Sequence, residues 1–75
     1  MLDGNLMDHV GRRVQRKGDA KLGKITELVH ASYAPNAEGI REEDDMVFGI
    51  DFPGERTRYI AARSSVLEKS DLKIM

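Results

Sequence analysis

The segment from residue 46 to residue 69 constrains the fold of this chain most strongly. Its first apolar residues recur at every second position: Met46, Phe48, Ile50 and Phe52. This period is typical of a strand that buries one face. Pro53-Gly54 then ends the strand, because proline removes a backbone donor and glycine accepts the positive φ of a tight turn. The pattern predicts a hairpin with strands over residues 45–52 and 56–62.

The rest of the chain also predicts short strands. We expect them over residues 9–16, 22–30 and 66–68, the last of these after a single turn at Ser64-Ser65. Residues 17–20 contain Gly and Asp and predict the turn between the first two strands.

Residues 22–30 allow a second interpretation. Gly23 inside the strand predicts a bulge or a sharp bend. A helix over residues 20–31 is the alternative, because Leu22, Ile25, Leu28 and Val29 recur at spacings of three and four. Gly23 and Thr26 disfavour the helix.

Five short strands predict an all-β fold, a mostly antiparallel and partly open small barrel. An open sheet of this size would leave long unpaired edges and too little core. We expect the barrel over residues 9–70, a flexible lead at residues 1–8 and a C-terminal tail at residues 71–75. The predicted core is Val10, Val14, Ile25, Leu28, Met46, Phe48, Ile50, Phe52, Ile60 and Leu67.

The formal net charge of -1 conceals two blocks of opposite sign. The first block is basic and contains Arg12, Arg13, Arg16, Lys17, Lys21 and Lys24. The second is acidic and contains Glu38, Glu42, Glu43, Asp44 and Asp45. All of the acidic block except Asp45 lies in a long connection, residues 31–44, which we expect to be a solvated loop between the second and third strands.

Composition narrows the function classes. A chain of 75 residues makes one domain and has little room for a deep substrate cavity. It has no cysteine, and no run of about 18 apolar residues that would span a membrane. The two histidines, His9 and His30, are too few for a metal or acid–base site. We expect a cytoplasmic, non-catalytic protein without a cofactor.

One part of the chain resembles a known family. The run from Phe48 to Gly54, a basic strand at residues 56–60 and Val66-Leu67-Glu68-Lys69 are together similar to the end of the C-terminal Tudor-like domain of UvrD/PcrA-type DNA helicases. Gly11, Val14 and Gly23-Lys24-Ile25 resemble the Gly-x-x-Val and Gly-x-Val pieces at that domain's start. Lys21 departs from the family, which has a glycine there, and the loop at residues 31–44 is longer and more acidic.

The resemblance implies an SH3-like, Tudor-like barrel that docks on RNA polymerase or on a partner in DNA repair or transcription. The chain has no phosphate-binding Gly-x-x-x-x-Gly-Lys-Ser/Thr motif, so it would be a free-standing copy of the docking domain and not a helicase. Such a module is expected to be monomeric until it meets its partner.

The second strand of the hairpin supplies the predicted partner-binding residues: Arg56, Arg58, Tyr59 and Arg63. Arginines beside an aromatic residue suit carboxylate-bearing partners, because the guanidinium group pairs through two donors and stacks through its plane. The alternative is that these are ordinary solvent-facing residues, with Tyr59 half-buried.

Nucleic-acid binding is the main rival function. The six cations from Arg12 to Lys24 suit weak, salt-sensitive and sequence-independent contact with phosphates. A pI near 6.1, the acidic loop and the scarcity of aromatic residues oppose it. A structural or assembly component, which would form a closed oligomer, is the third class.

Overall fold

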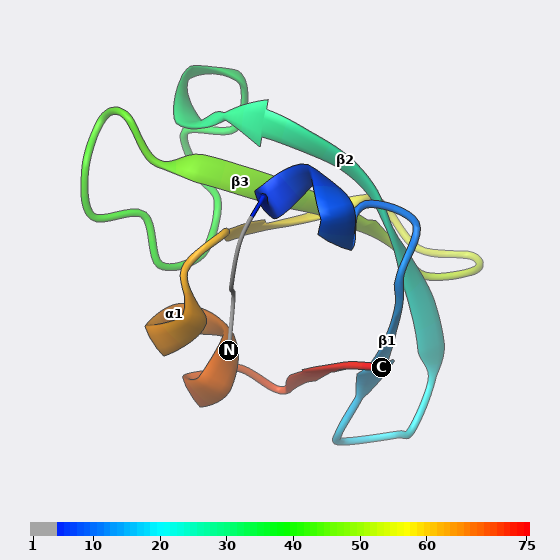
Figure 1. Cartoon of the computed structure of the whole chain (residues 1–75). Helices are drawn as coiled ribbons and strands as arrows, with labels where there is room; N and C mark the ends of the chain where they lie inside the picture. The colour runs from blue at the N-terminus through cyan, green and yellow to red at the C-terminus, as the bar shows by residue number, and fades with distance from the viewer. Residues whose placement is uncertain (1–4) are drawn as a thin grey trace.

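The computed structural model describes residues 5–75. Its elements are the 3₁₀ helix η1 (Leu6–His9), strands β1 (Arg13–Arg16) and β2 (Leu22–His30), the 3₁₀ helix η2 (Ala31–Tyr33), strands β3 (Met46–Asp51) and β4 (Arg58–Ala61), the helix α1 (Ser64–Lys69) and strand β5 (Leu72–Ile74). The strands form one antiparallel sheet in the order β4-β3-β2-β1-β5. The sheet curls round on itself (Figure 1), as in a small SH3-like barrel. The predicted all-β fold class is confirmed.

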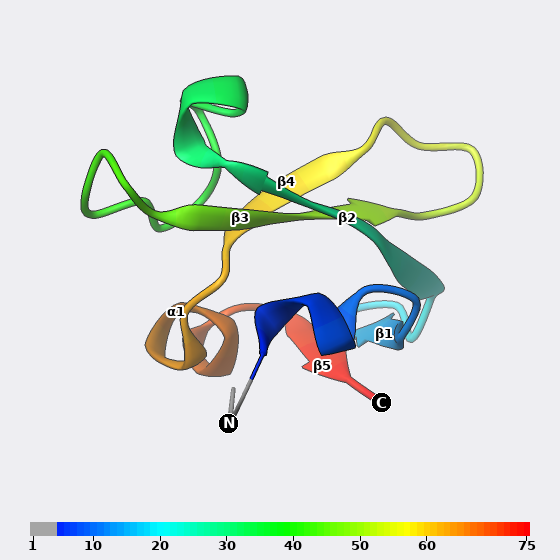
Figure 2. The same cartoon turned by 45° about the horizontal axis from the view of Figure 1, so that its top comes forward.

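Strand β2 produces the curl because it belongs to both halves of the sheet. Its first residues pair with β1 and the rest pair with β3. A bulge between Ile25 and Glu27 interrupts the second pairing, and bulges bend the strand that carries them. In Figure 2, β2, β3 and β4 lie together on one side, while β1, β5, α1 and η1 lie on the other. The helix predicted as an alternative over residues 20–31 is absent, since β2 occupies most of that range.

The main core lies between these two sides. It consists of Val14, Ile25, Phe48, Ile50, Phe52, Ile60, Leu67 and Leu72. Three predicted core residues, Val10, Leu28 and Met46, are only partly buried. Val47 was not predicted, yet it is fully buried in a second cluster with Ala31 and Ala34. Strand β3 is therefore covered on both faces, because the connection after β2 folds over the face that period-two alternation assigns to solvent.

The predicted hairpin is confirmed, with β3 and β4 slightly shorter than expected and paired antiparallel. Gly54 has a φ of 77° in the turn between them. The bulge expected at Gly23 lies two residues further on. Gly23 is required for a different reason: a Cβ built there would lie 2.7 Å from the Asp51 carbonyl oxygen and 2.8 Å from the Phe52 ring.

The N-terminal part of the chain differs from the prediction. His9 lies in η1 and the first strand starts only at Arg13, because the chain turns through Gly11 at a φ of 97°. Of the lead predicted at residues 1–8, residues 1–4 lie outside the described part of the chain. Asn5 accepts a hydrogen bond from Met7 N at 3.0 Å and so caps η1.

The strand predicted over residues 66–68 is wrong, since those residues lie in α1. The fifth strand is β5, in the segment predicted as a tail. Ser70 links the two elements: its hydroxyl donates to Leu67 O at 2.6 Å and accepts from Leu72 N at 3.1 Å. This turn places Leu72 in the core and lets β5 pair with β1.

A candidate docking surface on strands β1 and β5

Arg58, a predicted partner-binding residue, joins two distant parts of the chain. Its Nε lies 2.5 Å from Glu38 Oε2 and its Nη2 lies 2.6 Å from Asp71 Oδ1. The hydrogen bonds to Glu38 and Asp71 raise the pKa of Arg58, and the bond from Arg58 lowers the pKa of Asp71, because each partner stabilises the charged form of the other. Arg58 thus links the edge strand β4 to the acidic connection (residues 31–44) and to the turn before β5.

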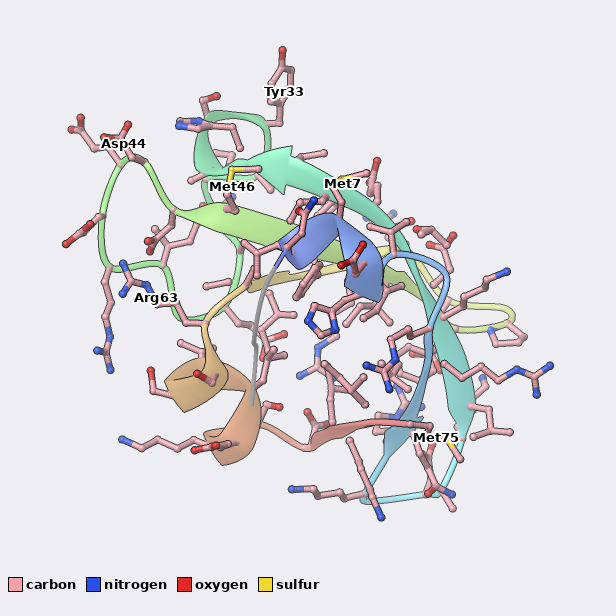
Figure 3. All side chains as sticks on the ribbon, in the orientation of Figure 1. Met7, Tyr33, Asp44, Met46, Arg63 and Met75 are labelled. Carbon is pink, nitrogen blue, oxygen red and sulfur yellow. The ribbon has the colours of Figure 1, made fainter. Side chains whose placement is uncertain are left out.

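Arg63 makes a similar contact with Asp45. Its guanidinium donates to Asp45 Oδ1, and the other carboxylate oxygen accepts from Arg41 N at 2.8 Å and Glu42 N at 3.1 Å. These donors, Arg63 first, hold the pKa of the almost buried Asp45 well below its usual range. Figure 3 shows Arg63 beside the loop that carries Asp44 at its tip.

The acidic connection is therefore only partly the solvated loop that we expected. Glu38 bridges to the edge of β4, where its N donates to Tyr59 O at 3.1 Å and its carbonyl accepts from Ala61 N at 2.8 Å. Asp45 is buried, whereas the Asp44 side chain is 98% exposed. Glu38 and Asp45 are thus held in the fold by Arg58 and Arg63, whereas the Asp44 side chain faces solvent.

The other two predicted partner-binding residues differ from each other. The Tyr59 hydroxyl donates to Glu27 Oε1 at 2.8 Å, and its ring packs against the second core cluster. This hydrogen bond raises the pKa of Tyr59. Arg56 is exposed and makes no hydrogen bond or ion pair within residues 5–75. Contact between this set and a partner stays a prediction.

Two of the six basic residues proposed for nucleic-acid contact are neutralised within the fold. Arg16 Nη1 lies 2.8 Å from Glu55 Oε1, and Lys21 Nζ lies 3.0 Å from Glu55 Oε2. Arg16 also pairs with Asp19 at 2.7 Å and lies over the Phe52 ring, 4.8 Å from its centroid. Hydrogen bonds from Arg16 and Lys21 lower the pKa of Glu55 to about 2. This cluster stabilises the hairpin turn against the β1–β2 turn.

The other four residues of the basic block lie on β1, beside it or on the adjacent strand β2, and Lys73 of β5 lies next to them. We define the basic surface as the exposed residues Arg12, Arg13, Lys17, Lys24 and Lys73. None of the five makes an ion pair within residues 5–75. Arg13 lies directly opposite Lys24 across the β1–β2 pair, and Gln15 lies opposite Lys73 across the β1–β5 pair. Because like charges directly opposite one another destabilise a sheet, Arg13 and Lys24 repel each other.

Apolar side chains are interspersed with these cations. Leu22 is 43% exposed and lies opposite Gln15, while Met75 is 55% exposed and its N donates to Arg13 O at 2.8 Å. Figure 3 places Met75 beside β1. Lys73 and Met75 were missed because residues 71–75 were expected to be a tail. The alternation of Leu72, Lys73 and Ile74 is the signal that identifies them, since it is the period of a strand.

No group of three or more histidine, aspartate or glutamate side chains in residues 5–75 is arranged to hold a metal ion. No helix in that range is long and apolar enough to cross a membrane.

Comparison of the chain with models of known protein families, with curated proteins and with solved structures gives no significant match. The fold and the surface alone define the class: a small all-β protein with a curled five-stranded antiparallel sheet, consistent with a small SH3-like barrel, that exposes a basic surface on β1 and β5.

Acid should destabilise this fold through the carboxylates that lie in ion pairs. The pKa values of Asp19, Asp45, Glu55 and Asp71 are all lowered in the folded protein. Such a group stabilises the fold above its unfolded pKa, about 4, and this stabilisation is lost as the pH falls from there toward the folded pKa. We expect Tm from circular dichroism to change little between about pH 7 and pH 5 and to fall between about pH 4.5 and pH 2.5.

Two neighbouring aspartates provide a matched comparison. Asp45→Asn should lower Tm at neutral pH and flatten the acid slope, because it removes one of the depressed carboxylates. Asp44→Asn is an equivalent change at a side chain that is 98% exposed and lies 3.6 Å from His30 Nε2. An ion pair this exposed contributes little to stability, so the variant should leave both quantities close to those of the parent. An acid slope in Asp45→Asn as steep as in the parent would contradict the assignment.

Proposed function

We propose that this chain is a non-catalytic docking module that binds an acidic segment of a partner protein through the basic surface. One observation carries the proposal: five exposed cations lie on β1, its flanks and the adjacent strands with no carboxylate partner in residues 5–75. Arg13 and Lys24 repel each other in the free protein, and an acidic partner relieves that repulsion.

The apolar residues favour a protein partner over a nucleic acid. Leu22 and Met75 offer apolar area at the basic surface, which a protein side chain can bury. A phosphate backbone is charged and cannot bury this apolar area. Binding of single strands also uses exposed aromatic rings on which bases stack, and the exposed Tyr33 lies on η2, away from the basic surface; Figure 3 shows its ring pointing away from the body of the protein.

The partner class follows from the family resemblance. Similarity to the C-terminal Tudor-like domain of UvrD/PcrA-type helicases makes RNA polymerase, or a factor in transcription or DNA repair, the proposed partner. The module then acts as a cytoplasmic monomer. The absence of a metal cluster in residues 5–75 is compatible with this binding role.

Sequence-independent nucleic-acid binding is the second candidate, and the same unpaired cations support it. Four of the six residues first proposed for that role, Arg12, Arg13, Lys17 and Lys24, belong to the basic surface. Phosphate contact would make the affinity fall steeply with salt, with a slope of about -0.7 to -0.9 per neutralised phosphate.

The test is a tagged pull-down from nuclease-treated cell extract at moderate salt, followed by mass spectrometry. The parent should retain RNA polymerase or a repair factor. Arg13→Glu/Lys24→Glu should reduce the retained partner at least about tenfold, since each reversal places a carboxylate opposite an acidic segment.

The control is Arg41→Glu/Arg56→Glu, which changes the net charge by the same amount at exposed arginines outside the basic surface. It should retain the partner, and it also tests the earlier prediction for Arg56. Equal loss in both variants would contradict a docking role for the basic surface. Recovery of nucleic acid alone, from extract without nuclease, would favour the second candidate.

A further inference from the structure

A cavity of about 520 Å³ opens beside the basic surface, between β1, α1 and β5. Leu67, Leu72 and Ile74 supply apolar lining, and Arg12, Lys17 and Lys73 supply cationic lining. Glu68 is the one carboxylate among its lining residues in the described part of the chain. The volume falls within the range of about 300–1,000 Å³ that is typical of ligand pockets. Apolar side chains together with an excess of cations match a ligand that is apolar in part and negatively charged in part.

His9 forms part of the wall of this cavity, although neither of its ring nitrogens is exposed there. The residue is only 7% exposed, and its ring lies edge-on to the Phe48 ring with their centroids 6.0 Å apart. Both ring nitrogens are buried, and neither has a hydrogen-bond partner in residues 5–75. A buried polar atom without a partner destabilises the fold, and native proteins contain few of them. A leucine at this position would pack against Phe48 without that penalty, so the stability of the free protein does not account for the imidazole.

We propose that this cavity is the anchor site of the docking surface and that it receives one apolar side chain of an acidic peptide segment. The apolar side chain lies against Leu67, Leu72 and Ile74, and the carboxylates on either side of it pair with Arg12, Lys17 and Lys73. A backbone amide group of the segment bonds to His9, whose ring turns toward the cavity on binding. The inference rests on the proposed function, because it names the part of the acidic partner that determines specificity.

A short peptide tests the site directly. The probe is the capped pentapeptide Glu-Asp-Leu-Asp-Glu, titrated into the full chain and followed by ¹H–¹⁵N NMR, with the His9 ring signals recorded as well. Glu-Asp-Gly-Asp-Glu lacks the apolar side chain, and Lys-Lys-Leu-Lys-Lys reverses the charge. We expect the leucine peptide to bind about tenfold more tightly than either of these. The shift changes should centre on Leu67, Leu72, Ile74 and His9.

Variants separate a binding role of His9 from a structural one. His9→Leu, with His9→Met as a second substitution, should raise Tm because it removes two unpaired polar atoms from the interior. The same variants should weaken binding of the leucine peptide about five- to tenfold, because one hydrogen bond is lost. A residue with only a structural role would change Tm and leave affinity unchanged. Arg12→Ala/Lys17→Ala should weaken binding about tenfold without a comparable change in Tm.

The possible outcomes separate the two proposals. Equal affinity for the leucine and glycine peptides, or shift changes away from the cavity, would overturn the anchor site. If Arg13→Glu/Lys24→Glu still abolishes capture in that case, the docking function stands without the anchor. Tight binding of the lysine peptide would overturn both, since the site would then not select negative charge. Unchanged affinity in the His9 variants would overturn the role of the imidazole.

Discussion

Phe48→Ala is expected to destabilise the protein by about 3–5 kcal/mol, because it leaves a large cavity at the centre of the main core. Phe48 is fully buried on β3, and Ile25, Ile50 and Ile60 of the same core are fully buried too. A domain of this length has a total stability of roughly 4–11 kcal/mol. The variant should therefore be largely unfolded in moderate urea, where the parent is still folded, and the free energy of unfolding from urea titration measures the difference.

Tyr33→Ala is the matched control, since it truncates an aromatic side chain that is 81% exposed. Its free energy of unfolding should stay within about 0.5 kcal/mol of the parent. A cost of less than about 1 kcal/mol for Phe48→Ala would contradict the position of Phe48 at the centre of the main core.

Gly39→Ala is expected to have the second large effect, about 2–5 kcal/mol, because strain and overlap add at this position. Gly39 has a φ of 76°, which a residue with a Cβ adopts only at a cost. A Cβ built there would also overlap with Val66 Cγ1. Since Gly39 follows the Glu38 bridge to β4, the added methyl group must displace either the acidic connection or α1.

Three other glycines separate the effect of a positive φ from the effect of overlap with neighbouring atoms. Gly54→Ala should cost about 1–2 kcal/mol, since it has a φ of 77° and open space around it. Gly23→Ala should cost about 1–3 kcal/mol through overlap with the Asp51 carbonyl and Phe52 ring alone. Gly18→Ala meets neither constraint and should change stability by less than about 1 kcal/mol. Urea titration of the four variants gives the ranking. If Gly39→Ala lowers the free energy of unfolding no more than Gly54→Ala does, the Val66 side chain moves aside at little cost and the overlap contributes nothing.

The hairpin was predictable because its signals are local. Period-two alternation from Met46 to Phe52 and the Pro53-Gly54 turn determine which residues face each other, whatever the rest of the chain does. The same alternation failed at Val47, because burial of the second face of β3 depends on where the connection of residues 31–44 folds. No local pattern in β3 specifies that.

The C-terminal elements were not predictable for a related reason. Val66-Leu67 is too short an apolar run to distinguish a strand from a helix. Strand β5 forms because Leu72 completes the core and β1 offers an unpaired edge, and β1 is distant in sequence. Lys73 joined the basic surface only through that pairing.

The composition and local patterns of the sequence by themselves determined the all-β class, the strands β2, β3 and β4, and the separation of charge into a basic and an acidic block. Which charges remain available for a partner was decided only by the tertiary structure. The curl of the sheet brings Glu38 to Arg58, Asp45 to Arg63 and Glu55 to Arg16, and so neutralises arginines that the sequence offers as binding residues. Ion pairs form between groups that are close in space, and separation along the chain does not measure that distance.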